Sequence, residues 1–433
     1  GYTKVLSTCT NLQHMSRKNI QSNQKVNIGE KIIFTYDVIW KQSDVAWSSR
    51  WDVYLNENHL VPAQVHWYSI SNSIFVVLFL SLLVISVLVR NLKRDIAGYN
   101  AILADEEEDD DVDESGWKLV HADVFRPPTT MPMLYCVLVG SGSQLTVSTL
   151  VTIGLAAIGF VNPSRRGSMM NATLVWFMLC GILAGYVSSR LYKAFRGRAW
   201  QLCTVCTAIL FPGFLFSVFL FFNTVLAFYH SSGSAPFLDI IILAAMWCCV
   251  SIPLVFVGAF FGYKAEAISF PTVTSTIARA IPEPQLLLNP KLCIAMAGVV
   301  PFAAAYVELF FIMSSLWMDQ YYYVFGFTLA VFVILLISCA ELTVLLVYYQ
   351  LVNENHRWWW FALLSSGSVA CYFFAYSVVW FQALEASKVW FTYVLYFGYM
   401  SLICFALFLV TGCVGALVSL WFVRKIFSSI KVD

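Results

Sequence analysis

The sequence predicts an all-α polytopic membrane protein, in which nine transmembrane helices follow the end of a lumenal β domain. Three observations predict this class. Hydrophobic residues make up 59% of the 433 residues and charged residues only 12%, whereas a soluble domain carries about 25% charged residues. Nine apolar stretches are each long enough to cross a bilayer, and the lysines and arginines gather in the loops of one side.

Residues 1–66 are expected to be the C-terminal part of a larger β-rich domain. Residues 32–40 and 47–55 show a period of two and are rich in β-branched and aromatic residues, which is typical of strands. The polar segment 41–46 between them favours a hairpin. Two strands alone are only marginally stable, and the chain opens at Gly1 without a signal peptide. We therefore expect the other strands of this domain to be missing from the sequence.

A nine-helix transmembrane domain is expected over residues 67–433. A bilayer core of about 30 Å requires roughly 20 apolar residues in a helix. The helix is required because lipid offers the backbone no hydrogen-bond partners. The segments that meet this requirement are approximately 70–89, 134–161, 171–191, 201–228, 237–262, 292–316, 323–350, 361–383 and 394–422.

The distribution of basic residues predicts the orientation of these helices. When the N-terminal segment is placed outside the cytosol and the helices alternate, most loop lysines and arginines fall on the cytosolic side. The short loops opposite carry only Arg165, Arg166 and Lys388. Tryptophans at predicted helix ends, such as the run Trp358–Trp360 and Trp421, are typical of the membrane interface. The N-terminus is therefore expected in the lumen and the C-terminus in the cytosol.

An acidic run stands out in the first cytosolic loop, which is predicted over residues 91–133. Every position from Asp105 to Glu114 is acidic except Val112. Such a block of like charges repels itself and stays solvated. It indicates either a spacer or a docking segment for a basic partner. The chain is predicted to end in a short cytosolic tail, residues 423–433.

Two carboxyls lie inside predicted helices, Glu308 in the sixth and Glu341 in the seventh. Charge within a bilayer is costly, so such residues are candidate functional sites. At 1.5 Å of rise per residue, the predicted helix ends separate the two by about 15 Å in depth, which is too far for a carboxylate pair. Each is either hydrogen-bonded to a neighbouring helix or part of a proton or substrate pathway.

Small residues at helical spacing mark two candidate contact faces. Gly181 with Gly185, and Gly258 with Gly262, form GxxxG motifs, which allow two helices to approach closely. They serve either packing within the bundle or contact with the helix of a client protein.

Three prolines fall inside predicted helices, namely Pro212, Pro253 and Pro301. Each removes a backbone donor and favours a kink. Broken membrane helices also occur at the substrate sites of transporters, so these prolines leave a transport function open.

No chemistry of catalysis or of cofactor binding is evident in the sequence. It contains no HExxH motif and no paired intramembrane aspartates. Cys203 and Cys206 form a lone CxxC, which is weak evidence for metal without a second pair of ligands. No basic stripe with interleaved aromatic residues suggests nucleic acid. We therefore expect a protein that is not an enzyme, with no cofactor, no metal and no nucleic-acid partner.

Blocks of sequence along nearly the whole chain resemble the nonaspanins, the transmembrane nine superfamily of endomembrane proteins. Their order and number make the resemblance specific. The blocks are Trp51–Asp52, Gly116–His121, Phe125–Pro128, Gly140–Gln144, Arg166–Gly167, Phe256–Lys264, Arg279–Glu283, Tyr322–Phe327, His356–Trp360, Tyr396–Tyr399 and Lys431–Asp433.

The resemblance implies a large lumenal β domain and residence in Golgi and endosomal membranes. It implies a role in sorting other membrane proteins, especially those with glycine-rich transmembrane segments. The family's Lys-x-Asp/Glu terminus, here Lys431 and Asp433, resembles a coat-binding retrieval signal. A fixed cation and nearby carboxylates allow paired charge-assisted hydrogen bonds with such coat proteins. The implied partners are thus lipids, client transmembrane proteins and coat proteins. A transporter or channel that uses Glu308 and Glu341 is the alternative.

Overall fold

The computed structural model describes residue 42 and residues 63–105, 117–161, 167–230, 233–283, 288–317, 325–383 and 390–428. The predicted hairpin, residues 106–114 of the acidic run, and Lys431 and Asp433 of the tail lie outside these ranges. The chain divides into two units, Gly1–Arg50 and Trp51–Asp433. The helices described below all belong to the second unit.

Nine helical stretches in the described part of the chain are long and apolar enough to cross a membrane, which confirms the predicted all-α class. They begin and end within a few residues of the predicted boundaries. The elements are α2 (Ala63–Asp105), η3 (Trp117–Val120), α3 (Pro132–Ala157), α4 (Ser168–Leu179), α5 (Gly181–Ala194), α6 (Trp200–Phe228), α7 (Phe237–Met246), η4 (Trp247–Ser251), α8 (Ile252–Lys264), α9 (Pro290–Ala297), α10 (Val299–Trp317), α11 (Phe325–Val352), α12 (Trp358–Gly367), α13 (Val369–Ala383) and α14 (Trp390–Ser428).

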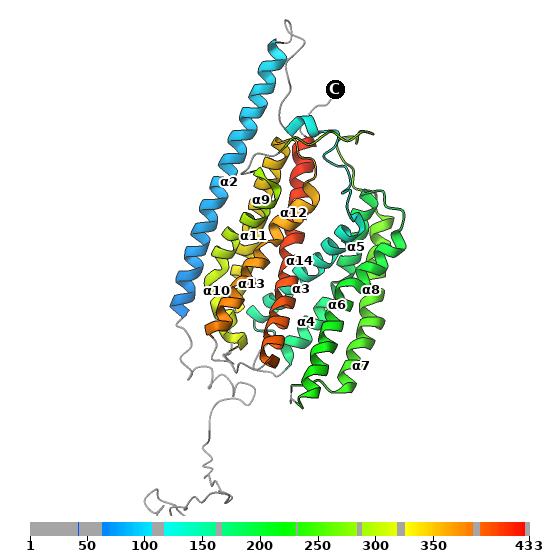
Figure 1. Cartoon of the computed structure of the whole chain (residues 1–433), viewed down its shortest axis with the longest axis vertical. Helices are drawn as coiled ribbons and strands as arrows, with labels where there is room; N and C mark the ends of the chain where they lie inside the picture. Colours follow the sequence, from blue (N-terminus) through cyan, green and yellow to red (C-terminus); the bar gives the residue numbers. More distant parts are fainter. Residues whose placement is uncertain are drawn as a thin grey trace, which may run out of the picture. The chain divides into compact units, whose positions relative to one another are not determined.

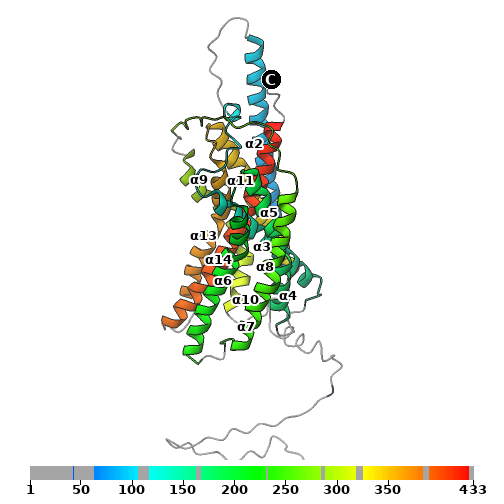
Figure 2. The same cartoon turned by 90° about the vertical axis from the view of Figure 1, so that its right-hand side faces the viewer.

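Helices α3 and α14 pack against each other and join two groups of helices. On one side α14 contacts α11, α12 and α13, and α2 and α10 pack on α11. On the other side α3 contacts α4, α5 and α6, and α5 packs on α8 (Figures 1 and 2). Close approach along α3 depends on glycine. A Cβ at Gly140 would lie 2.8 Å from the Ala184 carbonyl oxygen of α5, and a Cβ at Gly142 would overlap the Leu409 carbonyl of α14.

Four of the nine stretches are interrupted, which hydropathy alone does not predict. The third breaks at Cys180, the sixth at Gly298 and the eighth at Ser368, and the fifth contains the π-helical turn η4. Pro253 lies two residues after the end of η4 and Pro301 lies three residues after the break at Gly298, so two predicted kinks lie beside irregular backbone. Helix α6, by contrast, continues through Pro212.

The largest hydrophobic core cluster lies at the end of the bundle that carries most of the described cations. We call this end the basic end, and it comprises the loops 117–131, 195–199, 265–283 and 353–357 together with the last turns of α14. Trp358 and Trp359 are 0% and 2% exposed there and stack with ring centroids 4.1 Å apart. These two rings therefore pack inside the protein and do not face lipid. Trp421, by contrast, is 67% exposed.

Candidate functional site

Glu341 lies on α11 and its side chain faces α2. The Ser81 hydroxyl of α2 donates to its Oε1 atom at 2.5 Å. Its Oε2 atom is buried and has no hydrogen-bond partner among the described residues. Burying a polar oxygen without a partner costs about 1–3 kcal/mol. This oxygen therefore retains the capacity to accept a hydrogen bond as a carboxylate or to donate one as an acid.

Glu308 lies on α10 and is 2% exposed. The hydrogen bonds of α2 fix its depth relative to Glu341, because the Ser73 hydroxyl donates to the Ala304 carbonyl of α10 at 3.1 Å. Ser81 lies eight residues, or about 12 Å, nearer the basic end than Ser73. Glu308 lies four residues, or about 6 Å, beyond Ala304 in the opposite direction. The carboxyls are thus separated by about 18 Å in depth and do not form a pair.

The four candidate glycines face one another across a single helix pair, α5 and α8. A Cβ at Gly185 would overlap the Val255 carbonyl, and a Cβ at Gly258 would overlap the Ile182 carbonyl. Gly262 packs in the same way on Tyr186 and Ser189, and Gly181 faces the Val255 side chain at 3.3 Å. Of the two predicted uses, the structure places these residues in packing within the bundle. Their small faces are already covered.

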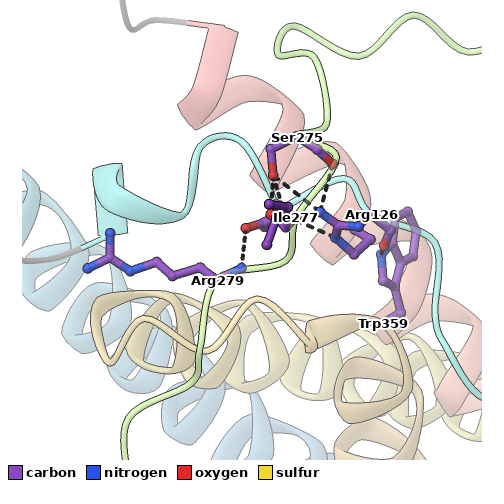
Figure 3. Close-up of polar contacts among 6 residues, drawn as sticks. Arg126, Ser275, Ile277, Arg279 and Trp359 are labelled. Carbon is purple, nitrogen blue, oxygen red and sulfur yellow. Dashed lines mark hydrogen bonds and ion pairs between the residues drawn. The ribbon is translucent and has the colours of Figure 1, made fainter.

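A polar cluster at the basic end centres on Asp123, which is 4% exposed. Arg126, Ser275 and Arg279 surround its carboxylate, and Figure 3 shows how these three residues converge. The Arg126 Nε atom donates to Oδ1 at 2.9 Å, the Ser275 hydroxyl donates to Oδ1 at 3.3 Å, and the Arg279 backbone N–H donates to Oδ2 at 3.0 Å. Because Arg279 also pairs with Glu354 at 3.0 Å, the Asp123 cluster connects three loops that are far apart in sequence.

The charges of the Asp123 cluster shift two pKa values in the loops. Desolvation raises the pKa of Asp123, but the hydrogen bond from the Arg279 backbone and the hydrogen bond and charge of Arg126 outweigh it, so the pKa lies below 3.8. Burial lowers the pKa of His356, and the charges of Arg357 and Arg126 oppose the stabilising effect of Asp123. At neutral pH the cluster therefore holds an ionised Asp123 beside a neutral His356.

Three indole N–H groups extend this connection between loops. Trp358 donates to the Val124 carbonyl at 2.7 Å, Trp359 to the Arg126 carbonyl at 2.9 Å, and Trp360 to the Thr130 carbonyl at 2.8 Å. Each bond satisfies a carbonyl of the loop that leads into α3. The three tryptophans at the start of α12 thus attach that helix to the loop 117–131. Asp123 was not predicted as a site residue, and its spacing of three residues from Arg126 was the available signal.

The interruptions of the sixth and eighth stretches lie against each other. A Cβ at Gly298 would lie 2.6 Å from the Val369 backbone nitrogen and 2.8 Å from the Ser368 hydroxyl. The Tyr372 hydroxyl donates to the Ala295 carbonyl at 2.5 Å, three residues before the break at Gly298. Two irregular backbone segments thus meet inside the bundle, where protein groups rather than lipid satisfy them.

Nine apolar helical stretches with buried carboxyls, joined at one end by connected loops, define a polytopic helical membrane protein. A family model described as Endomembrane protein 70 matches residues 2–389. The chain belongs to this family, the transmembrane 9 superfamily, and its predicted membership as a nonaspanin is confirmed.

Known members are similar along almost the full chain. Transmembrane 9 superfamily member 10 of Arabidopsis thaliana is 44% identical over 99% of this chain and 66% of its own length. Human members 4 and 2 are each 41% identical over 93% of this chain, which covers 62% and 60% of their lengths. The chain thus spans slightly less than two thirds of the relatives' length. No solved structure matches it.

Proposed function

We propose that this protein sorts other membrane proteins in Golgi and endosomal membranes by binding their transmembrane helices, without catalysis. The basic end faces the cytosol in this proposal, and the β-rich start of the chain lies in the lumen. The distribution of Lys and Arg supports the orientation, and the family description supports an endomembrane location. The observation that carries client binding is the unpartnered Oε2 atom of Glu341 beside α2.

The contact between α2 and α11 has the properties that helix recognition in lipid requires. Helices do not associate by hydrophobicity in lipid, so selectivity comes from close packing and interhelical hydrogen bonds. The GxxxG faces of α5 and α8 are occupied, whereas Glu341 has an oxygen to pair. A glycine-rich client helix can bring its backbone close to this carboxyl because glycine has no side chain in the way.

The flank of this contact is open to lipid. Ile74, Leu78 and Ile85 lie seven, three and four residues from Ser81, at helical spacing, and are 41%, 54% and 57% exposed. Residues four apart share a helix face, so Ile85 borders the Glu341 side, whereas Phe79, two residues from Ser81, points away. A client helix on this flank would touch both α2 and the Glu341 carboxyl.

A photoreactive amino acid at position 85 is expected to cross-link a glycine-rich transmembrane peptide in nanodiscs, since that side chain borders the proposed site. Position 79, which is 65% exposed on the same helix, is the matched control. Glu341→Leu should lower the adduct at position 85 several-fold. Equal labelling at both positions, or equal labelling of a polyleucine peptide, would contradict client binding here.

Retrieval by a coat protein through Lys431 and Asp433 is the second part of the proposal. Adding three alanines after Asp433 is expected to shift the protein out of the Golgi, because the terminal carboxylate and the cation lose their spacing from the chain end. Fluorescence microscopy of cells that express the tagged protein measures its fraction in the Golgi. An extension that itself ends in Lys-Val-Asp should restore the location, and unchanged location with the alanine extension would refute the signal.

Transport is the second candidate function, and the paired breaks at Gly298 and Ser368 favour it. Discontinuous helices that meet inside a bundle form substrate sites in several transporters. Flux into liposomes that contain the purified protein, lost on Glu341→Gln while the cross-linking persists, would favour transport over client binding.

A further inference from the structure

A cavity of about 520 Å³ opens at the basic end between α14 and the segment that follows α8. Its lining includes Phe270, Leu417 and Trp421 on the apolar side and Arg424 and Lys425 on the charged side. No carboxylate is among its lining residues. The last turns of α14, which supply most of the lining residues, are at the red end of that helix in Figure 1.

The two cations are not neutralised by the described protein. The ion pairs found in the described ranges are Arg126–Asp123 and Arg279–Glu354, and neither includes Arg424 or Lys425. Cations at a helix C-terminus complement the helix dipole, which explains their charge. It does not explain a cavity with an apolar floor beside them, nor the 67% exposure of Trp421.

The polarity of the cavity changes along α14. The apolar lining begins at Leu417 and the charged lining begins at Arg424, which is seven residues later, or about 10 Å along the helix axis. A phospholipid changes from apolar to charged in the same direction, from its acyl chains to its phosphate. Exposed tryptophan is typical of the depth at which these parts meet. A small soluble anion would use only the charged wall.

We propose that this cavity binds an anionic phospholipid of the adjacent leaflet whose headgroup carries a phosphomonoester. Arg424 and Lys425 hold the phosphate, Arg through its planar fork of donors and Lys as a point charge. Phe270, Leu417 and Trp421 contact the glycerol and upper acyl chain. Basic pockets between membrane helices recognise phosphorylated headgroups in this way.

Native mass spectrometry of the full chain in detergent tests the proposal with phosphatidylinositol phosphate, phosphatidylcholine and soluble inositol phosphate. We expect adducts with the first lipid only. The double variant Arg424→Gln with Lys425→Gln should lower its affinity at least tenfold, because each cation near the surface contributes several-fold. Trp421→Ala should also lower it.

The matched control removes two other exposed cations of the basic end, Arg196 and Arg198, which do not line the cavity. Arg196→Gln with Arg198→Gln should leave lipid binding unchanged. If both double variants lost lipid affinity equally, general surface charge would explain the binding and the proposal would be overturned. Equally tight binding of soluble inositol phosphate would overturn the lipid as occupant. A rise in lipid binding when residues 106–114 are neutralised would assign the cavity to that acidic run instead.

Discussion

Replacing Gly258 with alanine will lower the stability of the helix bundle by about 3 kcal/mol, at the upper end of the cost of overpacking a well-packed core. The added Cβ would overlap the Ile182 carbonyl. Because that obstacle is backbone, rotation of a side chain cannot relieve it, and α5 and α8 must separate. The thermal midpoint of the purified protein in detergent measures the loss, and Gly258→Leu should abolish recovery of folded protein.

Gly154 in α3 provides the matched control for this substitution. A Cβ there would meet nothing within 4 Å. Alanine also has the higher helix propensity, by about 1 kcal/mol, so Gly154→Ala should leave the midpoint unchanged or raise it. If both variants behaved alike, close packing of α5 on α8 would not be the function of the glycine motifs.

Replacing Asp123 with asparagine will destabilise the basic end by about 2–3 kcal/mol, the usual cost of losing hydrogen bonds to a charged group. Asparagine keeps the size of the side chain but loses the charge, and its amide nitrogen cannot accept from the Arg279 backbone or from Arg126. Hydrogen exchange of the loops 117–131 and 265–283 measures the change, because both loops depend on this carboxylate.

The effect of Asp123 depends on pH in a defined direction. Its pKa in the folded protein lies below 3.8, so its contribution is complete above that value and is lost as the pH falls through the lowered pKa. The wild-type chain should lose loop protection in that range, whereas Asp123→Asn should not show this loss. Burial lowers the pKa of His356 from 6.5, so the contribution of His356 is lost as the pH falls below 6.5 through that lowered pKa. A pH profile unchanged by Asp123→Asn would contradict the assigned role.

The sequence predicts the helices well because an apolar segment in lipid must satisfy its own backbone hydrogen bonds, which a helix does. The interruptions are different, since the break at Ser368 has no proline beside it and lies against Gly298 of another stretch. Trp358 and Trp359 follow the pattern of interfacial residues, yet their acceptors lie more than 200 residues earlier in the chain. Asp123 and Ser275 are likewise 152 residues apart. Local patterns carry no information about such pairs.

Helix α2 continues for eleven residues beyond its membrane-spanning stretch, which ends at Arg94, and stops at Asp105. Eleven residues of helix extend about 17 Å. At physiological ionic strength the Debye length is about 8 Å. The end of α2 therefore lies about two screening lengths beyond its apolar stretch, a distance over which the surface potential of a bilayer largely decays.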